Sequence, residues 1–186
     1  MTRSFPSRRA ALGLLGAAVL PLAGCAVTAL PAQTLSIPAD TKFAVLPLAN
    51  ATDVPMVERR AQAITVSLLQ QKGLRDVLVY PQKASDNPLD AEPAVSSAQA
   101  LAWARQQGAR YALSGTVTEW RYKTGVDSEP AVGITLQVID VPTGQVVWSA
   151  SGGRSGWGYQ ALSAVGQSQI EALLRGIRVT TAAAKS

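Results

Sequence analysis

The sequence VGITLQVIDVPTGQVVWSAS, residues 132–151, decides the fold. Its first eight residues form an extended apolar run, which predicts a strand. Residues 145–151 predict the returning strand, with Val146 and Trp148 on the same face. The residues between them, 140–144, predict a tight turn, because proline fixes φ, glycine permits a positive φ and aspartate caps the bend. The stretch therefore predicts a β-hairpin.

The chain before this hairpin alternates between extended and helical patterns. Short apolar runs at 43–48 and 77–80 predict two buried strands. An amphipathic helix is expected between them, from Pro55 to Gly73. A second helix is expected over 96–107, capped by its first serine and ended by the glycine that follows.

Strict alternation of side chains over residues 111–120 predicts a long strand directly before the hairpin, joined to it by a turn at 124–130. A last helix is expected over roughly 160–178, carrying Ile177 near its end. The element order is then β-α-β-α-β-β-β-α. This order predicts a single α/β domain with a mixed sheet over residues 41–180, followed by a short tail at 181–186.

The amino terminus carries the pattern of an exported lipoprotein. Three arginines precede an apolar run at 10–20, and Leu22-Ala23-Gly24-Cys25 follows. We expect residues 1–24 to be a lipoprotein signal peptide, Cys25 to be acylated, and residues 25–40 to be a short tether to the outer membrane. The alternatives are a plain signal peptide ending near a buried cysteine and, for the route of export, the twin-arginine system in place of the general one.

Composition argues against several classes of function. Fourteen basic and twelve acidic residues follow position 24, so the mature chain has a net charge near +2 and no basic stripe for nucleic acid. The chain has no histidine, its one cysteine is the lipidation candidate, and no phosphate-binding or nucleophile motif occurs. A glycosidase pairing Glu119 with Asp127 or Asp140 is the remaining enzymatic alternative. We expect no enzyme, no cofactor and no metal site.

Three segments together resemble one superfamily. They are residues 43–50 (FAVLPLAN), 110–117 (RYALSGTV) and 140–151, which contains Asp-x-x-Thr-Gly-x-x-x-Trp. The superfamily includes the amino-terminal domain of TolB, the curli secretion lipoprotein CsgG, the peptidoglycan-synthase activator LpoB and the PelC family. The turns are too short for a CsgG-like pore, the expected tether is too short for an LpoB-like activator, and no propeller follows. The chain therefore looks most like the PelC family of exopolysaccharide export lipoproteins.

That resemblance implies a dodecameric ring beneath the outer membrane, around a PelB-like barrel protein. One face would touch the membrane through aromatic residues. The opposite face would be electronegative and would guide a cationic polysaccharide chain toward the exit, because a charged funnel concentrates an oppositely charged polymer. An LpoB-like adaptor that activates envelope synthesis, or another secretion lipoprotein of this superfamily, is the alternative.

Particular residues are candidates for these roles. Tryptophan and tyrosine favour the membrane–water interface, so the interface candidates are Trp157, Trp148 and Tyr159, although packing on a helix is an equal possibility for Trp148. Trp103 and Trp120 are expected in the core or in subunit contacts. The acidic candidates for guiding the polymer are Asp86, Asp90, Glu92, Asp127 and Glu129.

Overall fold

The structure is a computed structural model that describes residues 27–31, 34–82, 95–125 and 128–181. The eight expected elements are present in the expected order, which confirms a mixed α/β fold. Their bounds are β3 (Lys42–Val45), α2 (Val57–Gln71), β5 (Asp76–Val79), α3 (Ser97–Gln106), β6 (Tyr111–Tyr122), β7 (Pro130–Asp140), β8 (Gln145–Ser155) and α4 (Leu162–Leu174).

Four short strands add to this plan: β1 (Val27–Pro31), β2 (Leu35–Pro38), β4 (Ala49–Asn50) and β9 (Ile177–Thr180). They correct two expectations. The segment expected to be a tether contains β1 and β2, and the last helix ends before Ile177, which lies in a strand. The physical reason is the partner that each strand finds: β2 pairs with β9, and β1 pairs with β8.

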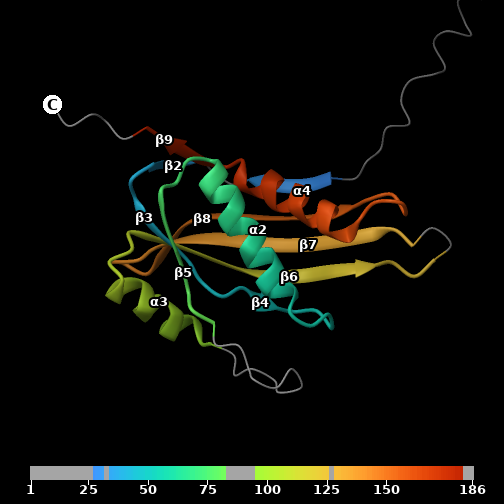
Figure 1. Ribbon diagram of the computed structural model, residues 1–186, viewed down its shortest axis with the longest axis horizontal. Coiled ribbons are helices and arrows are strands. Elements are labelled where there is room, and N and C mark those ends of the chain that lie inside the picture. The colour runs from blue at the N-terminus through green and yellow to red at the C-terminus, as the bar shows by residue number, and fades with distance from the viewer. Residues whose placement is uncertain (1–26, 32–33, 83–94, 126–127, 182–186) are drawn as a thin grey trace, which may run out of the picture.

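The main sheet runs in the order β1-β8-β7-β6-β3-β5, with β4 added beside β6 (Figure 1). The strands β3, β5 and β6 are parallel, and β6, β7, β8 and β1 are antiparallel. A parallel pair needs a crossover, and helix α2 between β3 and β5 and helix α3 between β5 and β6 supply those connections. The β2–β9 pair forms a separate small sheet beside the main one.

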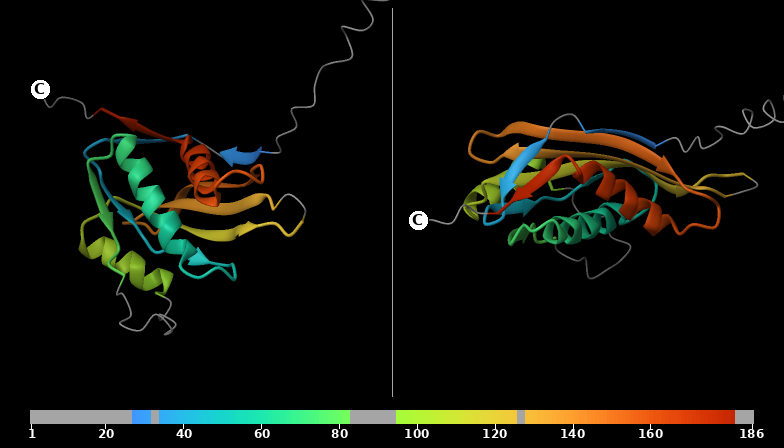
Figure 2. Two further views of the ribbon diagram at one scale, coloured as in Figure 1. Left: turned by 45° about the vertical axis from the view of Figure 1, so that its right-hand side comes forward. Right: turned by 90° about the horizontal axis from the view of Figure 1, so that it is seen from above.

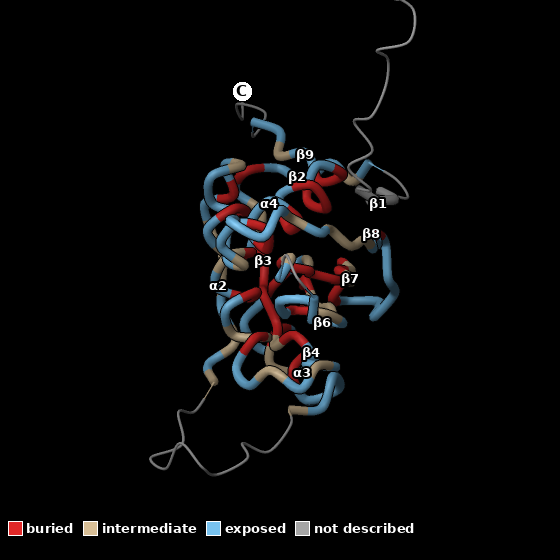
Figure 3. The backbone as a smooth tube through the Cα atoms, turned by 90° about the vertical axis from the view of Figure 1, so that its right-hand side faces the viewer, coloured by how far each residue is buried: buried red, intermediate tan, exposed pale blue. Residues whose placement is uncertain are grey.

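Helices α2 and α4 lie on the same face of the main sheet (Figure 2). The larger core lies between these two helices and the sheet (Figure 3). It includes the fully buried side chains of Phe43, Leu69, Leu136, Ile170 and Leu173. Helix α3 packs on the opposite face through a smaller cluster of alanines around Leu46 and Val141. This cluster covers the end of the sheet where β3 and β6 begin, and in the described ranges no other helix lies on that face.

The turn of the decisive hairpin is built as its sequence predicts. The backbone N–H and hydroxyl of Thr143 donate to the carboxylate of Asp140 at 3.1 and 2.9 Å. Gly144 has a φ of 74°, and its N–H donates to the carbonyl of Asp140 at 2.7 Å. Glycine adopts this left-handed backbone conformation at little cost in free energy, whereas other residues are strained there. The turn therefore requires glycine at position 144.

A β-bulge in the returning strand corrects one detail. Val138 pairs with Trp148, but Ile139 pairs with Val146, so Val147 is the extra residue. Val146 and Trp148 therefore face opposite sides of the sheet rather than the same side. Trp148 is 3% exposed and packs in the main core, whereas Val146 is 53% exposed.

Candidate functional site at the aromatic end of the sheet

Exposed aromatic side chains gather at the end of the sheet where β6 ends and α4 begins. Tyr122 is 48% exposed, Trp157 is 59% exposed and Tyr159 is 86% exposed. We call this region, defined by these three residues, the aromatic end. Sequence reasoning predicted Trp157 and Tyr159 but missed Tyr122, whose only signal was its position as the last residue of a long alternating strand.

Hydrogen bonds connect the two segments that form the aromatic end. The Tyr122 hydroxyl accepts from the backbone N–H of Leu162 at 3.1 Å, so the end of β6 holds the start of α4. The N–H of Gly156 donates to the carbonyl of Pro130 at 2.8 Å, which joins the end of β8 to the start of β7. The exposed aromatic rings are thus carried by backbone that the sheet holds in place.

The loop that presents Trp157 is closed by its own contacts. The N–H of Trp157 donates to the Gln160 side-chain oxygen at 2.9 Å, and the N–H of Gln160 donates to the Trp157 carbonyl at 2.8 Å. Gly156, just before, is packed so closely that a Cβ there would lie 2.7 Å from Val165 and 3.0 Å from Pro130. Glycine is required here because the loop crosses directly over the core.

Strand β1 lies at the same end of the sheet. Val27 pairs with Arg154, next to the last residue of β8. In the sequence, Val27 is two residues after Cys25. Cys25 itself and the signal peptide lie outside the described residues, but two residues span at most about 7 Å.

The other tryptophans do not join this group. Trp148, one of the interface candidates, is buried in the core, because it pairs with the buried Val138. This agrees with the alternative of packing beneath a helix and corrects the interface expectation. Trp120 is 3% exposed, also in the core. Trp103 on α3 packs edge-on against Tyr80, with ring centroids 5.1 Å apart.

The structure describes one of the five acidic candidates. Glu129 lies at the aromatic end, and its carboxylate is 3.9 Å from the ammonium group of Lys123, which also donates to Ser155 at 2.7 Å. Asp86, Asp90, Glu92 and Asp127 lie outside the described residues.

At the far end of the sheet, acidic residues are not in excess among the residues that the structure describes. This end contains the first residues of β3 and β5 and the last residue of β7. Its basic residues include Lys42, Arg75, Arg105 and Arg110, and its acidic residues are Asp40, Asp76 and Asp140.

Asp140 is engaged in structure rather than in binding. Its carboxylate forms an ion pair with Arg110 at 2.6 Å in addition to the two bonds from Thr143. The pKa of this carboxyl is lowered, mainly because the backbone N–H of Thr143 donates to it, with smaller contributions from the Thr143 hydroxyl and Arg110, while burial opposes the shift. Asp140 is thus held ionised at neutral pH to fix the turn.

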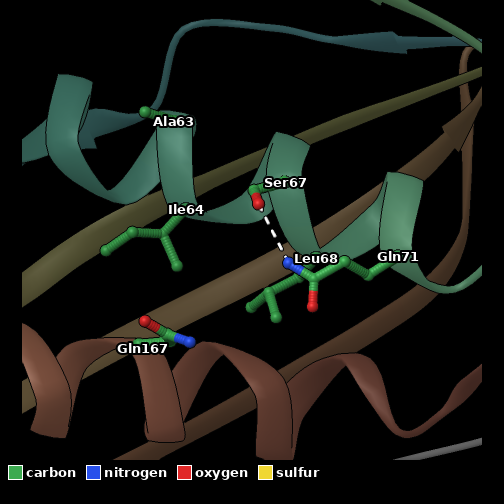
Figure 4. A pocket seen from close by; sticks show the side chains of 6 residues that line it. All are labelled: Ala63, Ile64, Ser67, Leu68, Gln71 and Gln167. Atoms are coloured by element: carbon green, nitrogen blue, oxygen red, sulfur yellow. Dashed lines mark hydrogen bonds between the residues drawn. The ribbon is translucent and has the colours of Figure 1, made fainter.

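A shallow depression of about 280 Å³ lies between α2 and α4 (Figure 4). Its lining is Ala63, Ile64, Ser67, Leu68, Gln71 and Gln167. The side-chain amide of Gln71 donates to the Ser67 hydroxyl at 3.0 Å. The lining contains no ionisable side chain, so it offers no general acid or base beside the Ser67 hydroxyl.

The described residues lack two further features. Among them, no group of three or more cysteine, aspartate or glutamate side chains is arranged to hold a metal ion. None of the helices in the described ranges has the length and apolar character needed to cross a membrane.

The chain matches one family model and the solved structures of a related protein. Residues 57–152 match the family model of the peptidoglycan-synthase activator LpoB. A PelC dodecamer from Paraburkholderia phytofirmans is 40% identical, with a TM-score of 0.72 over 83% of this chain and 99% of the relative. A point variant of that protein, also a dodecamer, gives the same values in another crystal form.

More distant structures share less of the fold. A lipoprotein from Neisseria meningitidis is 17% identical, with a TM-score of 0.48 over 73% of this chain and 96% of the other, which carries no functional argument. A search of curated proteins found no match.

Proposed function

Because this chain belongs to the PelC family, within the wider group that the LpoB model describes, we propose that it is a lipid-anchored outer-membrane component of an exopolysaccharide export apparatus. It forms a ring on the periplasmic face of the membrane and guides a Pel-like polymer to an outer-membrane barrel partner. The observation that carries this proposal is the 40% identity to PelC over 99% of that chain.

The aromatic end supports an orientation for each subunit. With Cys25 acylated, the pairing of Val27 with Arg154 keeps this end of the domain within about 7 Å of the anchor. Trp157 and Tyr159 are then at the height of the lipid headgroups, where amphipathic rings are favoured. The long strands β6, β7 and β8 point away from the membrane.

This orientation narrows the set of acidic residues that we propose to guide the polymer. Glu129 is at the membrane side and is paired with Lys123, so we assign it no part in the funnel. Asp86, Asp90 and Glu92 remain the proposed guiding residues, and Asp127 remains a weaker candidate. Attraction between their carboxylates and a cationic polymer would weaken with added salt, because exposed charges are screened within about 8–10 Å at physiological ionic strength.

The alternative is an adaptor that activates envelope synthesis, which the match of residues 57–152 to the LpoB model favours. The two functions differ in what fails when the protein is lost. Polymer export would stop in the first case, and peptidoglycan synthesis would slow in the second.

The test is deletion of the gene followed by complementation. We expect polymer to be lost from the medium and to be restored by the wild-type chain but not by Cys25→Ser, which lacks the acyl anchor. Unchanged polymer in the deletion strain, together with slower incorporation of peptidoglycan precursor, would reject the export function in favour of the adaptor.

A further inference from the structure

The outward surface of helices α2 and α4 carries no charge along most of its length. We call this surface the helix face. Its exposed residues are Ala63, Ser67, Gln70 and Gln71 of α2 and Ser163, Ala164, Gln167 and Ser168 of α4. The charged residues of these helices lie at the ends: Glu58, Arg59 and Arg60 at the start of α2, and Glu171 near the end of α4.

This composition is unusual for a surface that faces water. The solvent side of an amphipathic helix is normally charged or strongly polar. Here the residues are small or carry amides, and the depression between the helices, centred on Ser67 and Gln167, gives the face a shallow groove (Figure 4). Depletion of charge is what distinguishes the core of a protein–protein interface from the remaining surface.

A second face, on the other side of the same sheet, is uncharged in its central rows and carries the Glu119–Arg121 ion pair nearer the aromatic end. We call it the sheet face. Its central residues form two rows across β6, β7 and β8, namely Ser114, Gln137 and Ser149, and Thr116, Thr135 and Ser151. The hydroxyls of Thr135 and Ser151 lie 2.8 Å apart in a hydrogen bond.

The direction of these side chains follows from their neighbours. Leu136 and Val138 on β7 are buried in the core beneath α2 and α4, so Thr135 and Gln137 between them face the opposite side. On β8, Ser149 and Ser151 are exposed and flank the buried Ala150. Helix α3 packs near the start of β6, and no other described helix covers these two rows.

We propose that the helix face of one copy packs against the sheet face of the next copy. The two faces lie on opposite sides of the domain, and a contact between two different faces repeats head to tail until a ring closes. This inference rests on the proposed ring, and dodecameric relatives that are 40% identical argue for a second copy as the occupant.

The orientation of the domain supports the same occupant. With the aromatic end at the membrane, the strands stand away from the bilayer and both broad faces point sideways. Sideways is where the neighbours of a ring subunit lie. Small side chains such as Ala63 and Ser67 on one face and Ser149 on the other allow the backbones to approach closely.

The experiment places one arginine on each face of the full-length acylated protein, purified in detergent. The variants are Ser67→Arg on the helix face and Ser149→Arg on the sheet face, and the mass of each is measured by light scattering and sedimentation. We expect a single high-order species for wild type and monomers for each variant alone. An equimolar mixture of the two variants should form a dimer, because it keeps one intact face of each kind.

Every other pattern of masses overturns the proposal. The proposal would be overturned by a wild-type monomer, by a ring or a dimer in either variant alone, or by a mixture that stays monomeric. A dimer in a single variant would indicate like-with-like packing. Gln106→Arg on exposed α3 is the matched control and should remain a ring, as should Ser67→Ala. Circular dichroism and the unfolding midpoint must match wild type for each variant.

Polymer secretion by the same variants separates this inference from the proposed function. Monomeric variants that still export polymer would reject the ring as the exporting form and leave the packing of the two faces standing. Variants that remain rings and export normally would reject the packing and leave the export function standing.

Discussion

The ring of Trp120 lies directly against Gly166, so that a Cβ on this residue of α4 would overlap the indole. Trp120 is 3% exposed and belongs to the core beneath α4. The contact fixes how closely the last helix approaches β6. Since α4 begins at the aromatic end, this one contact also helps to position the proposed membrane-facing surface.

Gly166→Ala is therefore expected to destabilise the fold. Overpacking in a filled core costs about 1–3 kcal/mol, which exceeds the gain that alanine gives a helix. The free energy of unfolding from urea titration measures the effect. Gly125→Ala is the control, because nothing lies within 4 Å of that position, and it should change the free energy little. Equal values for the two variants would contradict the close contact.

Asp140→Asn is expected to lower the unfolding midpoint at neutral pH. In acid, the variant and the wild-type protein should unfold at similar midpoints. The pKa of Asp140 is lowered in the folded state, so its contribution is present above the ordinary pKa of about 3.9 and disappears as the pH falls through the folded value. The difference in unfolding midpoint between wild type and variant, measured from pH 7 downward, should shrink toward zero. The matched control is Asp53→Asn at an exposed carboxylate, which should change the unfolding midpoint little at neutral pH.

Replacing Asp86, Asp90 and Glu92 together by lysine should reduce polymer secretion without unfolding the domain. The reversed charge would repel a cationic chain where the native carboxylates attract it. Secreted polymer is quantified at matched protein abundance. Glu129→Lys is the control, since this residue is paired with Lys123 at the aromatic end, and it should secrete near the wild-type level. Normal secretion by the triple variant would remove these residues from the funnel.

Trp157→Ala should weaken attachment to the membrane while leaving the fold intact, because its ring is 59% exposed. Trp148→Ala should destabilise the fold, since removing a buried tryptophan costs about 3–5 kcal/mol of folding free energy. It removes no exposed aromatic ring that could contact the membrane. Flotation of the acyl-free chain with lipid vesicles reports attachment, and thermal unfolding reports the fold. Wild-type flotation by the Trp157 variant would show that the ring does not contact lipid.

The elements with a local signal could be predicted from the sequence. Alternation over β6, the apolar run of β3 and the turn residues between β7 and β8 each carry their own evidence. Strands β2 and β9 have no such local signal, because each has four residues and forms its hydrogen bonds with a partner some 140 positions away in the sequence. Their pairing is a property of the folded chain.

The candidate site was only partly predictable for a related reason. Alternation alone places Val146 and Trp148 on one face, and a single extra residue at Val147 separates them. Nothing in the sequence of β8 marks that bulge. Likewise, Glu129 resembles the other acidic candidates until the folded chain brings Lys123 to within 3.9 Å of it.

The pairing of Val27 with Arg154 has a consequence for assembly. A lipid joined to a long flexible linker would let each domain tumble, and neighbours would have to find one another in every orientation. In the proposed anchored ring, a lipid joined almost directly to a strand of the sheet would hold each domain upright, with its two broad faces already aimed along the membrane plane. Subunits then meet by lateral diffusion in two dimensions, at a high effective concentration, with most of the rotational search completed before first contact.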